Sequence, residues 1–359
     1  MLIEPRPNLK ELSAYSLPLF TAKYKLNANE SPWELPAAIR AEINAEFSDL
    51  NFARYPDPAC SSLKMAISNW LNVRTNEILL GSGSNEVIQC AFLAYGGVGR
   101  RAMSIYPTYA MAPKISAITG TEISYIKTNA DFWLDIELAY YEIKKKKPHI
   151  FYMANPNNPT GMYVDVADLR RLLEFEETLF VIDEAYGEFC DGSTLGFMSD
   201  YPNLVVVKTF SKAFRMAGLR FGIALSNENI ISEITKVKLP YNVNSVTQVV
   251  AEKVISNRNL LSDDIVLIKA ERERLYDFLA NDLSVTVVKS SANFLLFKTR
   301  FKADELFGML YENGVLIRNF NGYQGLDGYL RVTVGTPDEN NAFFEAMRKT
   351  MSRLEVGEN

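Results

Sequence analysis

Residues 203–225 read NLVVVKTFSKAFRMAGLRFGIAL, two apolar runs separated by a more polar segment. Apolar runs of this length, bounded by Asn, Ser and Gly, are typical of strands that are buried on both faces. The segment between them holds two cations, Lys212 and Arg220, among small, hydroxyl and aromatic residues. Both could be solvated cations in a surface turn, or Lys212 could be a reactive amine with Arg220 holding an anion beside it. The rest of the chain is needed to choose between these alternatives.

The alternation of apolar runs with amphipathic segments extends over residues 76–226. The apolar runs are EILLGSG, RAMSIYP, EISYIK, HIFYMAN, LFVIDEAY, NLVVVKT and LRFGIALS. Helix-like stretches lie between most of them, among them residues 85–95, 109–118 and 166–175. This order predicts an α/β fold with a mostly parallel sheet between two layers of helices. In such sheets the functional residues gather at the carboxyl ends of the strands.

The pattern changes after Pro240. A long helical stretch, roughly residues 246–280, leads into VTVVK, NFLLFK, VLIRNF and YLRVTVG, with helices expected at 303–313 and 337–354. We therefore expect a small α+β domain over residues 246–359, assisted by the N-terminal segment. Residues 35–245 form the predicted large domain, which opens with a helix at 35–47, and residues 1–34 form an N-terminal arm.

Composition limits the classes of function. The chain has 359 residues, is 48% hydrophobic and 23% charged, and carries a formal net charge of −5. This is the composition of a soluble globular protein, and it gives no reason to expect nucleic acid or a membrane as partner. Cys60, Cys90 and Cys190 are far apart and form no CxxC pair, which favours reduced thiols in the cytoplasm. The single histidine, His149, argues against a His-rich metal site, and we expect no metal.

Polar side chains follow five of the predicted strands. They are the loop GSGSNE at residues 81–86, Tyr109, Asn158, Asp183 with Tyr186, and Lys212. Each has an ordinary alternative, such as a Gly/Ser loop, an exposed aromatic residue or an Asn/Pro turn. The glycine loop lacks the third glycine of a dinucleotide-binding fingerprint and the GK[ST] of a P-loop. An acidic residue at the end of an apolar strand, as at Asp183, is costly unless a cationic group meets it.

Pyridoxal 5′-phosphate is one small molecule that uses all of these groups. Its phosphate needs N–H and hydroxyl donors, as at a helix N-terminus, and its flat ring stacks on an aromatic side chain. Its ring nitrogen needs a carboxylate to remain protonated, and its ring oxygen takes hydrogen bonds from tyrosine and asparagine. Its aldehyde forms a Schiff base with a lysine. The order of these groups along the chain predicts pyridoxal 5′-phosphate as the cofactor.

The chain resembles the fold-type-I aminotransferases, and within them it is most similar to the histidinol-phosphate aminotransferases. The resemblance runs from about Asn8 to Arg348. The stretches that carry it are NANE, RYPDP, GSGSNE, PTYAMA, PNNPTG, DEAYGEF, TFSKAFRMAGLRFG, LPYNVN and LRVTVGT. It implies a homodimer with the active sites at the subunit interface.

The resemblance also implies roles at the cofactor. Lys212 would hold the cofactor covalently, Asp183 would pair with its ring nitrogen, and Tyr186 and Asn158 would reach its ring oxygen. Tyr109 would stack on the ring. The groups implied at the phosphate are Ser84, Asn85, Thr209, Ser211 and Arg220, with Tyr55 contributed by the partner subunit. On this interpretation Arg220 is the anion-binding group and Lys212 is the reactive amine, which is the second of the two alternatives for residues 203–225.

On the substrate side, the resemblance implies that Arg331 and Arg318 grip the anionic end of the substrate. Both could instead be surface arginines. Tyr15 would reach over from the partner subunit, and Asn27 and Glu30 would line the substrate pocket. Two arginines suit a phosphate dianion, which favours histidinol phosphate with 2-oxoglutarate as acceptor, in histidine biosynthesis.

The chain departs from the family pattern in three places. It reads NESPWEL where the family has NENPxGP, Ser84-Asn85 where an alanine–aspartate pair is common, and YSLP where YVPG is frequent. The first and third departures lie on the substrate side. An aromatic amino acid aminotransferase and a threonine-phosphate decarboxylase on the same scaffold therefore remain alternatives, as does a non-catalytic module that binds the cofactor.

Overall fold

The computed structural model describes residues 3, 4, 6–9, 12, 14, 21–283 and 285–356. Its centre is a seven-stranded sheet with the order β2-β8-β7-β6-β5-β3-β4. The strands are β2 (Ile78–Gly81), β3 (Arg101–Tyr106), β4 (Glu122–Lys127), β5 (Ile150–Ala154), β6 (Leu179–Asp183), β7 (Leu204–Thr209) and β8 (Gly222–Leu225). All seven correspond to predicted runs. Strand β8 is antiparallel to both of its neighbours, β2 and β7, and the other pairs are parallel.

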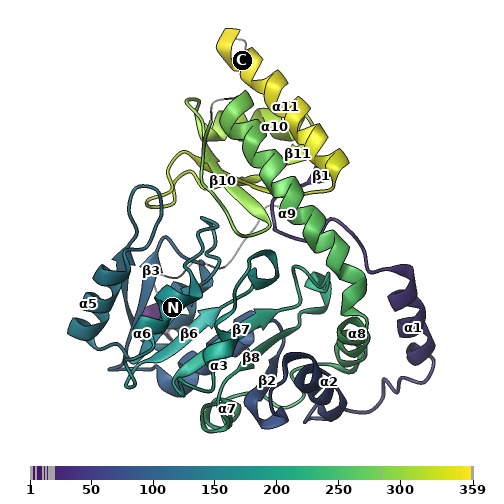
Figure 1. Ribbon diagram of the computed structural model, residues 1–359, viewed down its shortest axis with the longest axis vertical. Helices are drawn as coiled ribbons and strands as arrows, with labels where there is room; N and C mark the ends of the chain where they lie inside the picture. The colour runs from purple at the N-terminus through teal and green to yellow at the C-terminus, as the bar shows by residue number, and fades with distance from the viewer. Residues whose placement is uncertain are drawn as a thin grey trace.

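Two layers of helices bury the two faces of this sheet (Figure 1). One face packs against α3 (Ser84–Tyr95), α4 (Met111–Thr119) and α7 (Glu228–Thr235). The other packs against α1 (Ala37–Phe47), α2 (Ser61–Leu71), α5 (Ile136–Lys146), α6 (Val166–Leu172) and α8 (Ser245–Ser256). Alternate residues of the inner strands enter opposite layers, which is why these strands read as continuous apolar runs, whereas the edge strand β4 is only partly buried.

A smaller body lies at the C-terminal end of the chain. Its sheet has the order β12-β13-β10-β9 and is antiparallel throughout. The strands are β9 (Thr286–Val287), β10 (Phe294–Lys298), β12 (Arg318–Asn319) and β13 (Tyr329–Thr333), and the helices are α10 (Ala303–Glu312) and α11 (Pro337–Val356). Strand β1 (Tyr24–Lys25), from the N-terminal segment, pairs in parallel with β11 (Val315–Leu316).

The predicted helical stretch 246–280 is divided in two. Helix α8 ends at Ser256, a short 3-10 turn follows, and α9 runs from Ser262 to Asp277 before a π-helical turn. Asp263 and Asp264 lie in the first turn of α9, where acidic side chains favour a new helix start. Helix α8 contributes to the core under the large sheet, whereas the end of α9, from Leu275, contributes to the core of the smaller body. Helix α9 thus runs from one body to the other (Figure 1), and the domain division at residue 245 stays a prediction.

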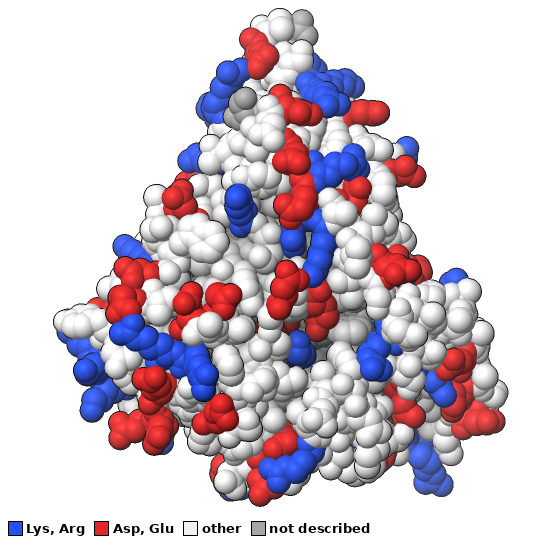
Figure 2. All heavy atoms as spheres, in the orientation of Figure 1, with Lys and Arg blue, Asp and Glu red and all other residues white. Residues whose placement is uncertain are grey.

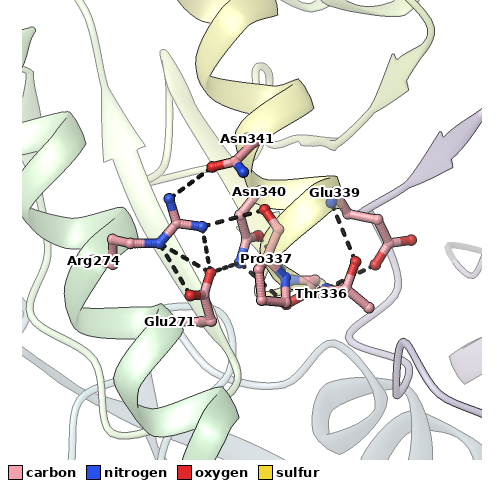
Figure 3. Close-up of polar contacts among 8 residues, drawn as sticks. Glu271, Arg274, Thr336, Pro337, Glu339, Asn340 and Asn341 are labelled. Atoms are coloured by element: carbon pink, nitrogen blue, oxygen red, sulfur yellow. Dashed lines mark hydrogen bonds and ion pairs between the residues drawn. The ribbon is translucent and has the colours of Figure 1, made fainter.

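A buried polar network holds the turn that follows β13 (Figure 3). Asn340 is fully buried; its Oδ1 accepts from the Gly335 N–H at 3.0 Å, and its Nδ2 donates to the Gly335 carbonyl at 3.1 Å and to Glu271 Oε2 at 2.7 Å. Arg274 donates to the same Glu271 carboxylate and to Asn341 Oδ1. Because Gly335 lies two residues beyond β13, this network anchors the strand that carries Arg331.

Asn340→Ala is expected to lower the free energy of unfolding by about 2–4 kcal/mol, because buried groups of Gly335 and Glu271 lose their partners. Urea denaturation followed by circular dichroism measures the change. Asn341→Ala is the matched control, since Asn341 is exposed and should cost at most about 0.5 kcal/mol. Equal effects of the two substitutions would contradict the role given to the network.

Positive and negative side chains are interspersed on the face that Figure 2 shows, and neither sign dominates it. Within the described residues, no helix combines the length and apolar character needed to cross a bilayer.

Candidate active site

Lys212 lies three residues after the end of β7, whose neighbour β6 runs parallel to it. Its Nζ donates to the backbone carbonyl of Ala28 at 3.0 Å, so the N-terminal segment lies directly against it. Burial, together with the nearby charges of Arg331 and Arg220, lowers the pKa of Lys212 to about 8. A sizeable fraction of this amine is therefore neutral and nucleophilic near neutral pH.

Asp183 is the last residue of β6 and is 2% exposed. Its Oδ2 accepts a hydrogen bond from Tyr152 Oη at 2.9 Å, and its Oδ1 accepts from the Ala185 N–H at 3.1 Å. Burial raises the pKa of Asp183 to about 6, although both hydrogen bonds oppose the rise. A carboxylate buried in this way is suited to pair with a cationic ring nitrogen.

A chain of hydrogen bonds joins Tyr186 to Arg331. Tyr186 Oη accepts from Asn29 Nδ2 at 2.9 Å and from Asn158 Nδ2 at 3.1 Å. Asn158 Oδ1 in turn accepts from Arg331 Nη1 at 2.7 Å. Asn29 also bonds to Thr333 of β13, at 2.9 Å through its backbone N–H. Groups predicted for the cofactor and for the substrate therefore belong to one connected polar network.

A cradle forms where the N-terminus of α3 meets Arg220. Arg220 Nη1 donates to Ser211 Oγ at 3.3 Å, and Ser211 contacts Thr209 Oγ1 at 3.1 Å. The backbone is close enough that a Cβ added at Gly222 would lie 2.3 Å from the Ser84 nitrogen, and one at Gly83 would lie 2.6 Å from Arg220 Nη2. Helix-start N–H groups, two hydroxyls and a guanidinium form a donor set that fits a phosphate dianion.

Of the two remaining residues predicted for the cofactor, Tyr109 lies at the site and Tyr55 does not. Tyr109 Oη donates to Asn85 Oδ1 at 3.2 Å, which links the residues after β3 to the start of α3. Tyr55 lies apart from this cluster: the residue is 79% exposed, and its ring stacks on Tyr241 with centroids 4.3 Å apart. Together with the cradle and the buried carboxylate, this arrangement fits pyridoxal 5′-phosphate.

Arg318 and Arg331 lie directly opposite each other on β12 and β13. Residues that are opposite in an antiparallel pair point to the same face, and both guanidinium groups lie over the ring of Phe320, at 5.8 Å and 5.5 Å. Arg331 is 6% exposed and donates to the Asn27 carbonyl at 3.0 Å, and Arg318 donates to Tyr323 Oη at 3.0 Å. Two adjacent guanidinium groups are a donor set that suits a doubly charged anion.

The remaining predicted substrate residues are placed as follows. Asn27 Oδ1 is buried and has no hydrogen-bond partner among the described residues. Glu30 forms an ion pair with Lys25 at 2.8 Å. Tyr15 lies outside the described residues.

Sequence reasoning missed three residues of the site: Tyr152, Asn29 and Thr333. Tyr152 is hidden within the apolar run HIFYMAN, where a tyrosine reads as core. Asn29 belongs to the motif NANE that was recognised, but its partner Tyr186 is 157 residues away. One feature of the sequence could have indicated these residues: each places a polar group in a segment that is expected to be buried, where such a group needs a hydrogen-bond partner.

The chain is similar to known proteins in both sequence and structure. The sequence model of the family "Aminotransferase class I and II" matches residues 21–347. The chain is 40% identical over 337 residues to histidinol-phosphate aminotransferase 1 of Carboxydothermus hydrogenoformans, covering 94% of this chain and 95% of that protein. It is 34% identical over 347 residues to the histidinol-phosphate aminotransferase of Caldanaerobacter subterraneus subsp. tengcongensis, covering 97% and 98% of the two chains.

Solved structures agree on the fold. The histidinol-phosphate aminotransferase of Clostridium acetobutylicum superposes with a TM-score of 0.85 at 24% identity, covering 92% of this chain and 99% of that chain. The enzyme of Sinorhizobium meliloti in complex with pyridoxal-5′-phosphate gives a TM-score of 0.84 at 22% identity, covering 93% and 92%. The L-threonine-O-3-phosphate decarboxylase of Porphyromonas gingivalis has a similar fold, with a TM-score of 0.80 at 22% identity and coverage of 92% and 99%.

Proposed function

Because the chain belongs to the class I and II aminotransferase family, we propose that it transfers the amino group of histidinol phosphate to 2-oxoglutarate. The products are imidazole-acetol phosphate and glutamate, in histidine biosynthesis. Members of this family are pyridoxal 5′-phosphate-dependent aminotransferases, and this chain is one of them. The observation that carries the substrate proposal is the pair of arginines, Arg318 and Arg331, opposite each other across β12 and β13.

When bound, pyridoxal 5′-phosphate supplies an electron sink for negative charge that develops at the substrate Cα. Lys212 would attach the cofactor and, once free, would be the base that takes the Cα proton; its lowered pKa suits both tasks. Asp183 holds a proton on the ring nitrogen, and Tyr186 and Asn158 bind the ring oxygen. Tyr109 covers the ring. The phosphate would be held by Ser84, Asn85, Thr209, Ser211 and Arg220, of which the last three are joined by hydrogen bonds.

On the substrate side, Arg331 and Arg318 bind the phosphate of histidinol phosphate, and Arg331 binds a carboxylate of glutamate in the second half-reaction. Asn27, whose buried Oδ1 has no partner among the described residues, accepts a hydrogen bond from the substrate. Glu30 lines the same pocket, whereas the predicted partner residue Tyr15 lies outside the described residues.

We also propose that the enzyme is a cytoplasmic homodimer. Phe52, Tyr55, Leu239 and Tyr241 are all exposed, and such a group of large apolar side chains suits a subunit interface. In the dimer Tyr55 would reach the cofactor phosphate of the second copy. The three cysteines are free thiols, which suits a reducing compartment.

Testing this function requires the purified, cofactor-loaded protein and three amino donors: histidinol phosphate, phenylalanine and threonine phosphate. Conversion of the bound cofactor to its amine form is recorded for each, along with any carbon dioxide released. Histidinol phosphate should react with the highest kcat/KM. Preference for phenylalanine would indicate an aromatic amino acid aminotransferase, and release of carbon dioxide from threonine phosphate would indicate a decarboxylase. Either result would contradict histidinol phosphate as the substrate.

Arg318→Ala is expected to lower kcat/KM for histidinol phosphate by about 10- to 100-fold and to affect glutamate less, because only the dianion needs the second guanidinium. Arg331→Ala should damage both half-reactions to a similar extent and leave the cofactor absorbance intact. Single-turnover kinetics with each substrate separates these effects. Arg300→Ala is the control, since Arg300 is exposed and paired with Glu355. Normal kinetics of Arg318→Ala on both substrates would show that Arg318 does not bind the substrate phosphate.

A mixture of Lys212→Ala chains and Tyr55→Ala chains is expected to regain activity. If Tyr55 acts in the site of the second copy, each hybrid dimer holds one site with both defects and one with neither. The mixture is unfolded, refolded together and assayed against the two separate homodimers treated alike. Activity equal to the average of the two homodimers would show that Tyr55 and Lys212 serve the same chain's site.

A further inference from the structure

The hydroxyl of Tyr152 lies on the Asp183 carboxylate inside the sheet. Tyr152 is fully buried on β5, and its Oη donates to Asp183 Oδ2 at 2.9 Å. In the register of the two parallel strands, Tyr152 is opposite Val181 and Ala154 is opposite Asp183. Tyr152 and Asp183 therefore point to the same face of the sheet, two residues apart in register, which is within the reach of an aromatic side chain.

Packing alone does not account for this hydroxyl. On the opposite face of the sheet, the buried aromatic residues Phe151 and Phe180 fill the core without one. Transfer of a hydroxyl from water to an apolar interior is costly unless it is hydrogen-bonded, and the hydroxyl of Tyr152 is bonded to Asp183. The ring of Tyr152 therefore belongs to the core, whereas its hydroxyl matters for the carboxylate.

Because of the surroundings of Asp183, the hydrogen bond from Tyr152 influences whether the Asp183 carboxylate is charged. Burial raises the pKa of Asp183 to about 6, the neighbouring Glu184 raises it further, and the bonds from Tyr152 and the Ala185 N–H lower it. The Glu184 charge is itself met by Lys208 of β7 at 3.2 Å. Burial and the Asp183 charge raise the pKa of Tyr152 well above its usual value, with smaller contributions from Tyr109 and Tyr186, so it remains a donor at neutral pH.

We propose that Tyr152 is a positioning residue of the aminotransferase reaction: its hydroxyl keeps the Asp183 carboxylate ionised and fixed in orientation for the ring nitrogen of the cofactor. This rests on the role of Asp183 proposed above. A protonated Asp183 cannot hold a proton on the ring nitrogen, so loss of the hydroxyl weakens the electron sink through Asp183.

The first measurement uses the cofactor-free protein. The infrared carboxyl band of Asp183 is identified by its absence in Asp183→Asn and titrated with pH. The midpoint should lie near pH 6 in the wild type and rise by about one to two pH units in Tyr152→Phe, because a hydrogen bond to the charged form is lost. Tyr125→Phe, which removes a hydroxyl from β4 of the same sheet, should leave the midpoint unchanged.

The second measurement uses the holoenzyme loaded with cofactor that is ¹⁵N-labelled in the ring. Its ¹⁵N signal reports whether the ring nitrogen is protonated. The signal should move towards the unprotonated value in Tyr152→Phe and reach it in Asp183→Asn. A purely structural role of Tyr152 would lower stability without moving either signal.

Should Tyr152→Phe fail to fold, 3-fluorotyrosine at position 152 retains the shape of the side chain and makes its hydroxyl a stronger donor. The Asp183 midpoint should then fall below that of the wild type. An unchanged midpoint in the folded variant overturns the inference and leaves the role of Asp183 intact. An unchanged ring-nitrogen signal in Asp183→Asn overturns the role of Asp183, and the inference with it.

Discussion

Lys212→Ala is expected to lower the rate of amino transfer about 10³-fold or more, because the substitution removes both the point of covalent attachment and the base that moves the Cα proton. Lys212 is placed for both tasks by the turn after β7 and by its contact with the Ala28 carbonyl at 3.0 Å. The measurement is single-turnover conversion of histidinol phosphate. Lys236→Ala is the matched control, since Lys236 is exposed and paired with Glu233 at 2.5 Å.

Two further results identify the same lysine. Borohydride reduction of the wild-type holoenzyme, followed by peptide mapping, should attach the cofactor to Lys212; a labelled peptide from another part of the chain contradicts the assignment.

Because burial lowers the pKa of Lys212 to about 8, the neutral amine is lost as the pH falls below that value. Capture of added cofactor by the cofactor-free protein should then slow about tenfold for each pH unit below 8. Slowing that begins instead near the pKa of an exposed lysine would show that the environment of Lys212 does not lower its pKa.

Asp183→Asn is expected to retain the fold and lower kcat/KM about 10²-fold or more. The amide has the shape of the carboxylate but carries no charge, so it cannot keep the ring nitrogen protonated. The loss should appear in both half-reactions, because both need the electron sink. Asp200→Asn serves as the control, since Asp200 is exposed. Turnover near that of the wild type, with an unchanged thermal midpoint, would exclude the proposed pairing of Asp183 with the ring nitrogen.

Much of the fold could be predicted from local patterns. The seven apolar runs between residues 76 and 226 became the seven strands of the large sheet, because strands buried on both faces need continuous apolar sequence. The interruption of the 246–280 stretch was not predicted, since both of its halves have helical character. It depends on α8 packing under the large sheet while the end of α9 packs with the smaller body.

The cofactor also follows from the chain by itself, since parallel strands bring their carboxyl ends to one edge, and Asp183 and Lys212 lie at or just beyond such ends. The contacts between those ends required the tertiary structure. Neither the bond of Tyr152 to Asp183 nor that of Asn29 to Tyr186 leaves a mark in the sequence, because each joins residues at least 31 positions apart. The pKa values of Asp183 and Lys212 arise in the same way: residue type sets the ordinary value, and burial among particular neighbours moves it.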